Sequence, residues 1–163
     1  MKIYQTSEIR NIALVGGAKS GKTTMAEAMA FVGGVINRRG TVEDKNTISD
    51  YRDIELDRRY SVNTTLLYSE FNGKKINILD VPGFADYQGE VATAFNVVEA
   101  ALVLVNAQSG IEVGTEVAYR YSNKIGTPMI FVINQLEAEK ANFDDAVHQL
   151  QDYFGNKCTV LQF

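Results

Sequence analysis

Hydrophobic and polar positions along the chain predict short strands that alternate with helices. Continuous apolar runs are typical of strands covered on both faces of a parallel sheet, and they occupy residues 9–15, 100–105 and 129–133. Apolar residues at helical spacing predict helices at residues 25–32, 87–98, 113–125 and 143–154. A last short strand is expected at residues 158–161. This order predicts a three-layer α/β domain with a mostly parallel, doubly wound sheet, whose ligand site lies at the carboxyl ends of the strands.

Two segments depart from this alternation. Residues 62–71 and 75–79 flank Asn72-Gly73, a dipeptide that favours the tight turn of a β-hairpin, so one antiparallel strand pair is expected. Residues 37–61 carry twelve charged side chains and little apolar periodicity. This pattern predicts a long loop, and loops of such length are usually functional or disordered.

The composition is that of one ordinary globular domain: the chain has 163 residues, of which 45% are hydrophobic and 22% charged. A net charge of −4 argues against a domain that binds DNA or RNA through a general basic field. The single cysteine, Cys158, cannot form an internal disulfide, and no signal segment opens the sequence, so we expect a cytoplasmic location. The apolar runs are too short to span a bilayer. We expect a monomer without membrane contact.

Residues 16–23 match the phosphate-binding pattern GxxxxGK[ST] and lie between a predicted strand and a predicted helix. In this context, backbone N–H groups and the amino end of the helix can bind phosphate oxygens. Lys22 can reach the outer phosphates, and the Thr23 hydroxyl can ligate Mg²⁺. A flexible glycine-rich turn without a ligand is the alternative. The predicted nucleotide-binding residues are Gly16, Gly17, Ala18, Lys19, Ser20, Gly21, Lys22, Thr23 and Thr24.

A second motif, DxxG, follows the second strand of the predicted hairpin. Such a turn is common by itself, but here it comes about sixty residues after the phosphate-binding motif, which indicates a GTPase. Asp80 lies at the carboxyl end of the strand, where it can hold the magnesium shell, while the Gly83 N–H can face a γ-phosphate. The motif adds Asp80, Val81, Pro82, Gly83 and the adjoining Phe84 to the predicted site.

The segments RNIALVGGAKSGKTT, DRRYSVNTTL, INILDVPGFADY and FVINQLE occur in the order found in elongation factor G. Over essentially its whole length the chain resembles the amino-terminal GTPase domain of that family. The resemblance implies a P-loop GTPase fold, GTP and GDP as ligands, Mg²⁺ as cofactor, and the ribosome as partner of the full-length protein. The family's domain continues with an inserted subdomain, a final guanine motif and a last helix. None of these occurs here, so we expect residues 1–163 to be a truncated GTP-binding domain.

Four sites depart from the pattern of elongation factor G. Lys19 stands where the family has Asp, and Phe84 stands where it has the His that orients the attacking water. Ser61 replaces the magnesium-binding Thr of switch I but still offers a hydroxyl ligand. The guanine motif NKxD is replaced by residues 134–137, which are Asn-Gln-Leu-Glu.

The altered guanine motif predicts a weakened preference for guanine. Glu137 keeps a carboxylate that can accept hydrogen bonds from guanine N1 and N2, although its extra methylene displaces the oxygens by about one bond length. Gln135 lacks the alkyl stem and ammonium of the family's Lys. Asn134, Gln135 and Glu137 are the predicted base-binding residues. A polar strand end without such a role is the alternative.

The resemblance implies GTP hydrolysis with Lys22, Gly83 and Phe84 at the catalytic positions. Phe84 is a non-catalytic replacement, because phenylalanine has neither donor nor acceptor, so we expect hydrolysis to be slow. One alternative is a switch that binds GTP with little or no hydrolysis. A second is that Phe84 forms part of a hydrophobic gate and that another group, such as Asp86 or a ribosomal phosphate, positions the water. Another alternative is an ATP-using P-loop protein in which residues 134–137 match by accident.

Two segments are expected to change between ordered and released states with the bound nucleotide, namely residues 37–61 and 83–91. Arg58 and Arg59 are interpreted as solvated loop charges, with a phosphate contact by either as the alternative. His148 is interpreted as a structural or solvated residue, and Cys158 as a small core hydrophobe.

Overall fold

A single five-stranded sheet forms the centre of the computed structural model, which describes residues 3–155 and 157–162. The strand order is β2-β3-β1-β4-β5, in which β3, β1, β4 and β5 are parallel and β2 pairs antiparallel with β3. The predicted mixed sheet with one antiparallel hairpin is therefore confirmed. The strands are β1 (Ile9–Gly16), β2 (Thr65–Phe71), β3 (Lys74–Asp80), β4 (Ala100–Asn106) and β5 (Met129–Asn134).

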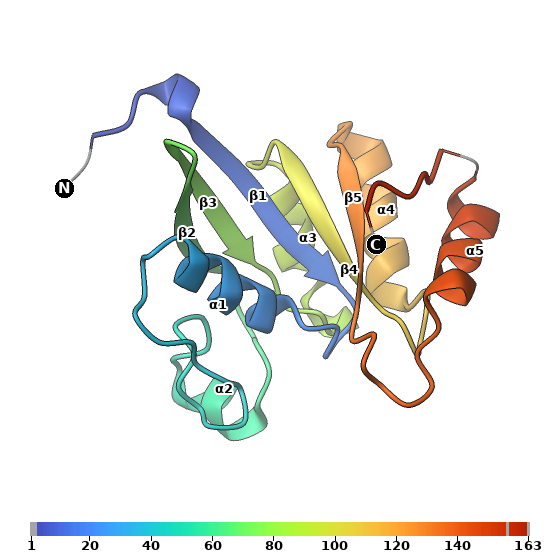
Figure 1. The fold of residues 1–163 in the computed structure, drawn as a ribbon, viewed down its shortest axis with the longest axis horizontal. Coiled ribbons are helices and arrows are strands. Elements are labelled where there is room, and N and C mark those ends of the chain that lie inside the picture. Colours follow the sequence, from blue (N-terminus) through green and yellow to red (C-terminus); the bar gives the residue numbers. More distant parts are fainter. Residues whose placement is uncertain (1–2, 156, 163) are drawn as a thin grey trace.

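Helices cover both faces of the sheet and complete the three layers. Figure 1 shows α1 on one face and α3 and α4 on the other. The helices are α1 (Lys22–Val32), α2 (Asp53–Arg58), α3 (Gln88–Phe95), α4 (Val113–Ile125) and α5 (Phe143–Phe154), with 3₁₀ turns η1 (Thr6–Glu8) and η2 (Ala85–Tyr87). None of the helices in the described part of the chain has the length and apolar character that crossing a bilayer requires.

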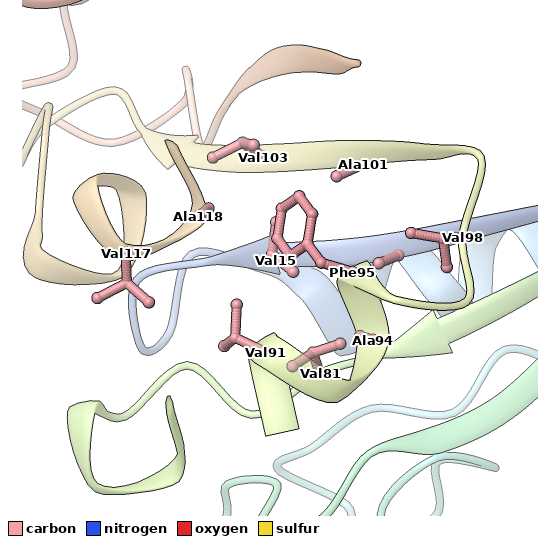
Figure 2. Packing of buried hydrophobic residues seen from close by; sticks show 11 residues of the cluster. Val15, Val81, Val91, Ala94, Phe95, Val98, Ala101, Val103, Val117 and Ala118 are labelled. Carbon is pink, nitrogen blue, oxygen red and sulfur yellow. The ribbon is translucent and has the colours of Figure 1, made fainter. Parts of the chain in front are cut away.

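Successive residues of β1 point to opposite faces and join separate cores. Ala13 and Val15 pack in the cluster on the side of α3 and α4, whereas Leu14 packs in the cluster on the side of α1. Phe95 of α3 is almost completely buried and lies at the centre of the first cluster (Figure 2). Burying one such side chain contributes about 1.5–3 kcal/mol. The carboxyl end of β1, where the phosphate-binding motif begins, is thus packed between these two cores.

Capping residues explain two predicted helix boundaries. The Asn142 side chain accepts hydrogen bonds from the N–H groups of Asp144 and Asp145 at the start of α5. Gly126 takes a left-handed conformation after the last residue of α4, with φ 86°. Both helices have the predicted residue ranges.

The structure differs from the sequence prediction in two segments. The strand expected at residues 158–161 is wrong, because no described part of the chain pairs with it. The Cys158 N–H instead donates to the Gly155 carbonyl, and the Gln151 Nε2 donates to the Cys158 carbonyl at 3.0 Å. The charged segment 37–61 is not a plain loop either, since it contains the six-residue α2.

Candidate nucleotide-binding site

The predicted phosphate-binding motif forms the turn between β1 and α1. Lys22, the first residue of α1, is 6% exposed, and its Nζ donates to the Gly17 carbonyl at 2.6 Å and to the Gly16 carbonyl at 3.4 Å. Burial lowers the pKa of Lys22 to about 8, although the negative charges of Asp80 and Glu112 oppose the shift. A buried ammonium at the amino end of a helix is suited to bind an anion.

The DxxG turn packs directly on this loop. A Cβ atom on Gly83 would lie 2.6 Å from the Gly17 carbonyl oxygen and would also collide with the Lys22 ammonium. Only glycine permits this approach. The two motifs, about sixty residues apart in the sequence, therefore meet at one place.

Beside Lys22, hydroxyl groups converge on a buried carboxylate. Thr23 Oγ1 donates to Asp80 Oδ2 at 2.8 Å, and Ser49 Oγ donates to the same oxygen at 2.6 Å. Burial raises the pKa of Asp80 to about 6, and the hydrogen bonds from Ser49 and Thr23 partly oppose this shift. Ser61 joins the group, with its Oγ 3.3 Å from Thr23 Oγ1.

Asp50 supplies a second carboxylate to this cluster. Its Oδ1 accepts a hydrogen bond from Ser61 Oγ at 2.7 Å. Burial raises the pKa of Asp50, and the hydrogen bond from Ser61 opposes the shift. Neither Ser49 nor Asp50 was singled out by the sequence patterns, because no motif surrounds them within the charged segment.

The donor set of the cluster fits a hard divalent cation. Within residues 3–155 and 157–162, Asp80 Oδ1 and Asp50 Oδ2 are buried without a hydrogen-bond partner. Buried carboxylate oxygens are costly unless they are paired or coordinate a metal. Carboxylate and hydroxyl oxygens are the ligands that Mg²⁺ prefers, so the residues present fit this ion.

The end of β5 is fastened to the phosphate-binding loop. Asn134 Nδ2 donates to the Ser20 carbonyl at 2.9 Å, and Gln135 Nε2 donates to the Lys19 carbonyl at 3.0 Å. Asn106 Nδ2 at the end of β4 donates to Gln135 Oε1. Glu137 lies on an exposed turn beyond β5. The structure thus brings Asn134 and Gln135 to the loop but leaves Glu137 outside these contacts.

Phe84 packs against the charged segment. Its ring centroid lies 4.5 Å from that of Tyr60, and the two ring planes are tilted by 54°. Arg58 Nη1 donates to the Tyr60 hydroxyl at 2.9 Å, so this arginine contacts an aromatic ring. Phe84 therefore joins the DxxG turn to residues 58–60 by an apolar contact.

A cavity of about 390 Å³ lies between these elements. Its lining combines the phosphate-binding loop, the charged segment and the DxxG turn, and includes Arg59 and Gln135. The lining includes neither Arg58, Asn134 nor Glu137. A second hollow, near Asn11 and Phe71, contains none of the predicted site residues.

Comparison with known proteins identifies the family. The model described as the elongation factor Tu GTP binding domain matches residues 7–162. The chain belongs to this family. Members carry the GTP-binding domain of translation factors, and the family confirms the predicted translational GTPase class and its P-loop fold.

Individual relatives of this GTP-binding domain are translation factors. An elongation factor G-like protein of Mycobacterium tuberculosis is 32% identical over 153 residues, which are 94% of this chain and 21% of that protein. Peptide chain release factor 3 of Lactobacillus helveticus is 33% identical over 150 residues, which are 90% of this chain and 29% of that protein. The chain thus spans less than a third of the length of these relatives.

Solved structures share the fold of the GTP-binding domain. A crystal structure of a Thermus thermophilus protein matches with a TM-score of 0.87 and 36% identity, over 91% of this chain and 22% of that chain. Translation elongation factor SelB from Methanococcus maripaludis, in complex with a GTP analogue, matches with a TM-score of 0.65 and 17% identity. That match covers 88% of this chain and 25% of that chain, and it shows the fold alone.

Proposed function

We propose that this chain binds Mg-GTP and GDP as the G domain of an elongation factor G-like translation factor, and that it hydrolyses GTP slowly. One observation carries the proposal: Thr23, Asp80 and Ser61 gather their oxygens beside the buried Lys22, where the DxxG turn meets the phosphate-binding loop. Such a pairing of an ammonium with oxygen ligands suits a phosphate chain and its magnesium ion.

The phosphate chain would lie along residues 16–24. Lys22, whose ammonium is bonded to loop carbonyls, would turn to the β- and γ-phosphates, and the Gly83 N–H would face the γ-phosphate. Thr23, Ser61 and Asp80 would hold Mg²⁺, together with Asp50. When bound, the ion supplies positive charge that offsets the phosphates.

Guanine recognition rests on the end of β5. Asn134 and Gln135 are bonded to the phosphate-binding loop, so they would fix the distance between the base and the phosphates. Glu137 would accept hydrogen bonds from guanine N1 and N2, which requires its exposed turn to close on the base.

The hydrolytic step lacks a water-orienting side chain at Phe84. Phe84 instead packs on Tyr60, an arrangement that holds residues 58–60 against the DxxG turn. This contact favours a second candidate function, a binding switch with little or no GTP hydrolysis. Single-turnover GTP cleavage with and without ribosomes, measured on the full-length protein, distinguishes the two.

For the whole protein we propose the ribosome as partner and the cytoplasm as location. The relatives' names, which include an elongation factor G-like protein and peptide chain release factor 3, support a role in translation. We further propose that residues 1–163 are monomeric and that they are a truncated part of a single GTP-binding domain.

Competition among nucleotides tests the proposed ligand. GDP, GTP and ATP are titrated into the 163-residue chain and into the full-length protein, with Mg²⁺ present. Guanine nucleotides are expected to displace a fluorescent GDP analogue from one site at lower concentrations than ATP does. Equal displacement by ATP and GTP would refute guanine selectivity and favour an ATP-using protein.

A further inference from the structure

A buried carboxylate on α1 has no role in the site described above. Glu27 lies in the middle of α1 and is 0% exposed. No Lys or Arg of the described residues forms an ion pair with it. A carboxylate buried without a cation must be stabilised by hydrogen bonds, because its transfer from water is otherwise very costly.

The hydrogen bonds to Glu27 come from the backbone of the charged segment. Gly40 N–H donates to Oε2 at 2.9 Å, and Ile48 N–H donates to Oε1. One carboxylate therefore holds both ends of the loop 40–48 against α1. Figure 1 shows the segment after α1 looping below this helix to reach α2.

The loop 40–48 is built to present these two N–H groups. Thr41 N–H donates to Asn46 Oδ1 at 2.8 Å, and Asp44 N–H donates to Thr41 Oγ1 at 3.1 Å, so the loop is braced internally. A Cβ atom on Gly40 would lie 2.8 Å from the Thr47 Cα, so a larger residue would displace the Gly40 N–H from Glu27. The loop behaves as one unit attached to α1 at Glu27.

Ile48, the last residue of this loop, directly precedes Ser49 and Asp50, which belong to the cluster around Asp80. Ser49 Oγ donates to Asp80 Oδ2, and Asp50 Oδ1 accepts from Ser61 Oγ. The bond from Ile48 to Glu27 is therefore one residue away from the oxygens that surround the predicted magnesium site. Among the described residues, the Glu27 carboxylate accepts hydrogen bonds from backbone N–H groups and from none of the predicted ligands, so it positions Ser49 and Asp50 through the backbone, while its negative charge also acts on Asp50.

We propose that Glu27 is a positioning residue that ties the loop 40–48 to α1 and thereby places Ser49 and Asp50 at the cluster of Asp80 and Ser61. Its effect on Mg-nucleotide binding rests on the proposed function. The attachment of the loop to α1 does not, since it depends only on hydrogen bonds between Glu27 and the backbone of the chain itself.

The perturbation is Glu27→Gln, which keeps the size of the side chain but replaces one acceptor oxygen by an NH₂ donor. One of the two backbone N–H groups then faces a donor and loses its bond. Glu55→Gln is the matched control. Glu55 is also buried, at 1% exposure, and its Oε1 accepts from Val62 and Asn63 N–H at 3.0 and 3.2 Å, at the other end of the segment.

Hydrogen exchange of the nucleotide-free 163-residue chain reads the attachment directly. Glu27→Gln is expected to speed exchange of at least one of the Gly40 and Ile48 amides by about ten- to a hundredfold, leaving those of Val62 and Asn63 unchanged. Glu55→Gln keeps one oxygen that can still accept from Val62 and Asn63 N–H, so it is expected to leave exchange of the Gly40 and Ile48 amides unchanged. Val98→Ala, a core change at the opposite end of the sheet, should not speed exchange of the Gly40 and Ile48 amides relative to that of the Val62 and Asn63 amides. Unchanged exchange of Gly40 and Ile48 in Glu27→Gln would overturn the attachment.

Nucleotide affinity measured with and without Mg²⁺ tests whether Glu27 places Ser49 and Asp50 at the predicted magnesium site. Glu27→Gln is expected to weaken GDP binding in Mg²⁺ by about tenfold and to leave binding in EDTA unchanged, since the phosphate-binding loop is intact. Val98→Ala should leave the ratio of the two affinities at the wild-type value. If Glu27→Gln speeds amide exchange in the loop 40–48 but leaves the ratio of GDP affinities with and without Mg²⁺ unchanged, Glu27 does not place Ser49 and Asp50.

The two assays separate this proposal from the proposed function. A wild-type chain that binds no nucleotide in either buffer refutes the proposed function, while hydrogen exchange still judges the attachment. If Glu27→Gln does not fold, Glu27→Asp is measured instead, because it buries no new donor but is one methylene too short to reach both amides. Wild-type behaviour of that variant overturns the proposal. Failure of both variants to fold also overturns it, because Glu27 would then serve the whole fold.

Discussion

Replacing Asp80 by Asn is expected to stabilise the nucleotide-free chain and to abolish its response to Mg²⁺. The Asp80 carboxylate is fully buried, and its Oδ1 has no partner among the described residues. An Asn side chain at this position can keep one oxygen for the hydroxyls of Thr23 and Ser49 while removing the buried charge. The variant therefore removes a destabilising charge and a metal ligand together.

The magnitude follows from the pKa of Asp80. Burial raises it from 3.8 to about 6, a difference that corresponds to about 3 kcal/mol. Because the folded-state pKa is the higher one, the associated stability is fully present below 3.8 and is lost as the pH rises through about 6. As the pH rises from 3.8 to about 6 and above, the free energy of unfolding of the nucleotide-free wild type should therefore fall by the contribution of Asp80. Asp80→Asn has no carboxylate at this position and should not show this contribution.

Urea unfolding at several pH values, with and without Mg²⁺, checks this prediction. Subtracting the curve of Asp80→Asn from that of the wild type removes the contribution of the other carboxylates. Mg²⁺ at neutral pH should stabilise the wild type, since it binds the ionised carboxylate of the folded state, and should leave the variant unchanged. Identical pH dependence of the two proteins would refute the reasoning, as would a less stable variant at neutral pH.

Three further predictions concern the nucleotide. Phe84→His should raise ribosome-stimulated GTP cleavage by the full-length protein about 10²- to 10⁴-fold, measured in single turnover; fast cleavage by the wild type would contradict a slow GTPase. Gln135→Ala removes the link between β5 and the Lys19 carbonyl and should weaken GDP binding about tenfold in a fluorescence titration, whereas wild-type affinity would exclude a role for the link. Lys19 is exposed at the loop tip, and its ammonium can supply the positive charge that a monovalent cation would otherwise supply beside the phosphates. GTP affinity should therefore not change when potassium is replaced by a bulky organic cation, and a strong requirement for potassium would reject this role of Lys19.

The elements that local chemistry determines were predictable from the sequence. The N-cap at Asn142 and the stop at Gly126 depend on the residue itself, so the ends of α5 and α4 agree with the pattern. The phosphate-binding loop was predictable because GxxxxGK[ST] between a strand and a helix has one backbone geometry. Its contact with Gly83 follows from the parallel order of β1 and β3, whose carboxyl ends meet.

Features that depend on tertiary contacts were not predictable. The pattern at residues 158–161 is apolar enough for a strand, but strand formation requires a neighbour in the sheet, and the chain turns at Cys158 instead. Ser49 and Asp50 enter the site because Glu27 holds the preceding loop, a contact between residues twenty-one positions apart. No spacing rule anticipates a bond of this kind.

Titration of GTP into the 163-residue chain and its Lys22→Ala variant, at fixed Mg²⁺, tests the central claim most directly. The claim is that the buried Lys22 ammonium binds the β- and γ-phosphates of a guanine nucleotide. A charge-assisted hydrogen bond contributes about 1.5–3 kcal/mol, so the account predicts that the variant binds GTP about ten- to a hundredfold more weakly. Equal affinity of the wild type and a correctly folded Lys22→Ala variant would contradict it.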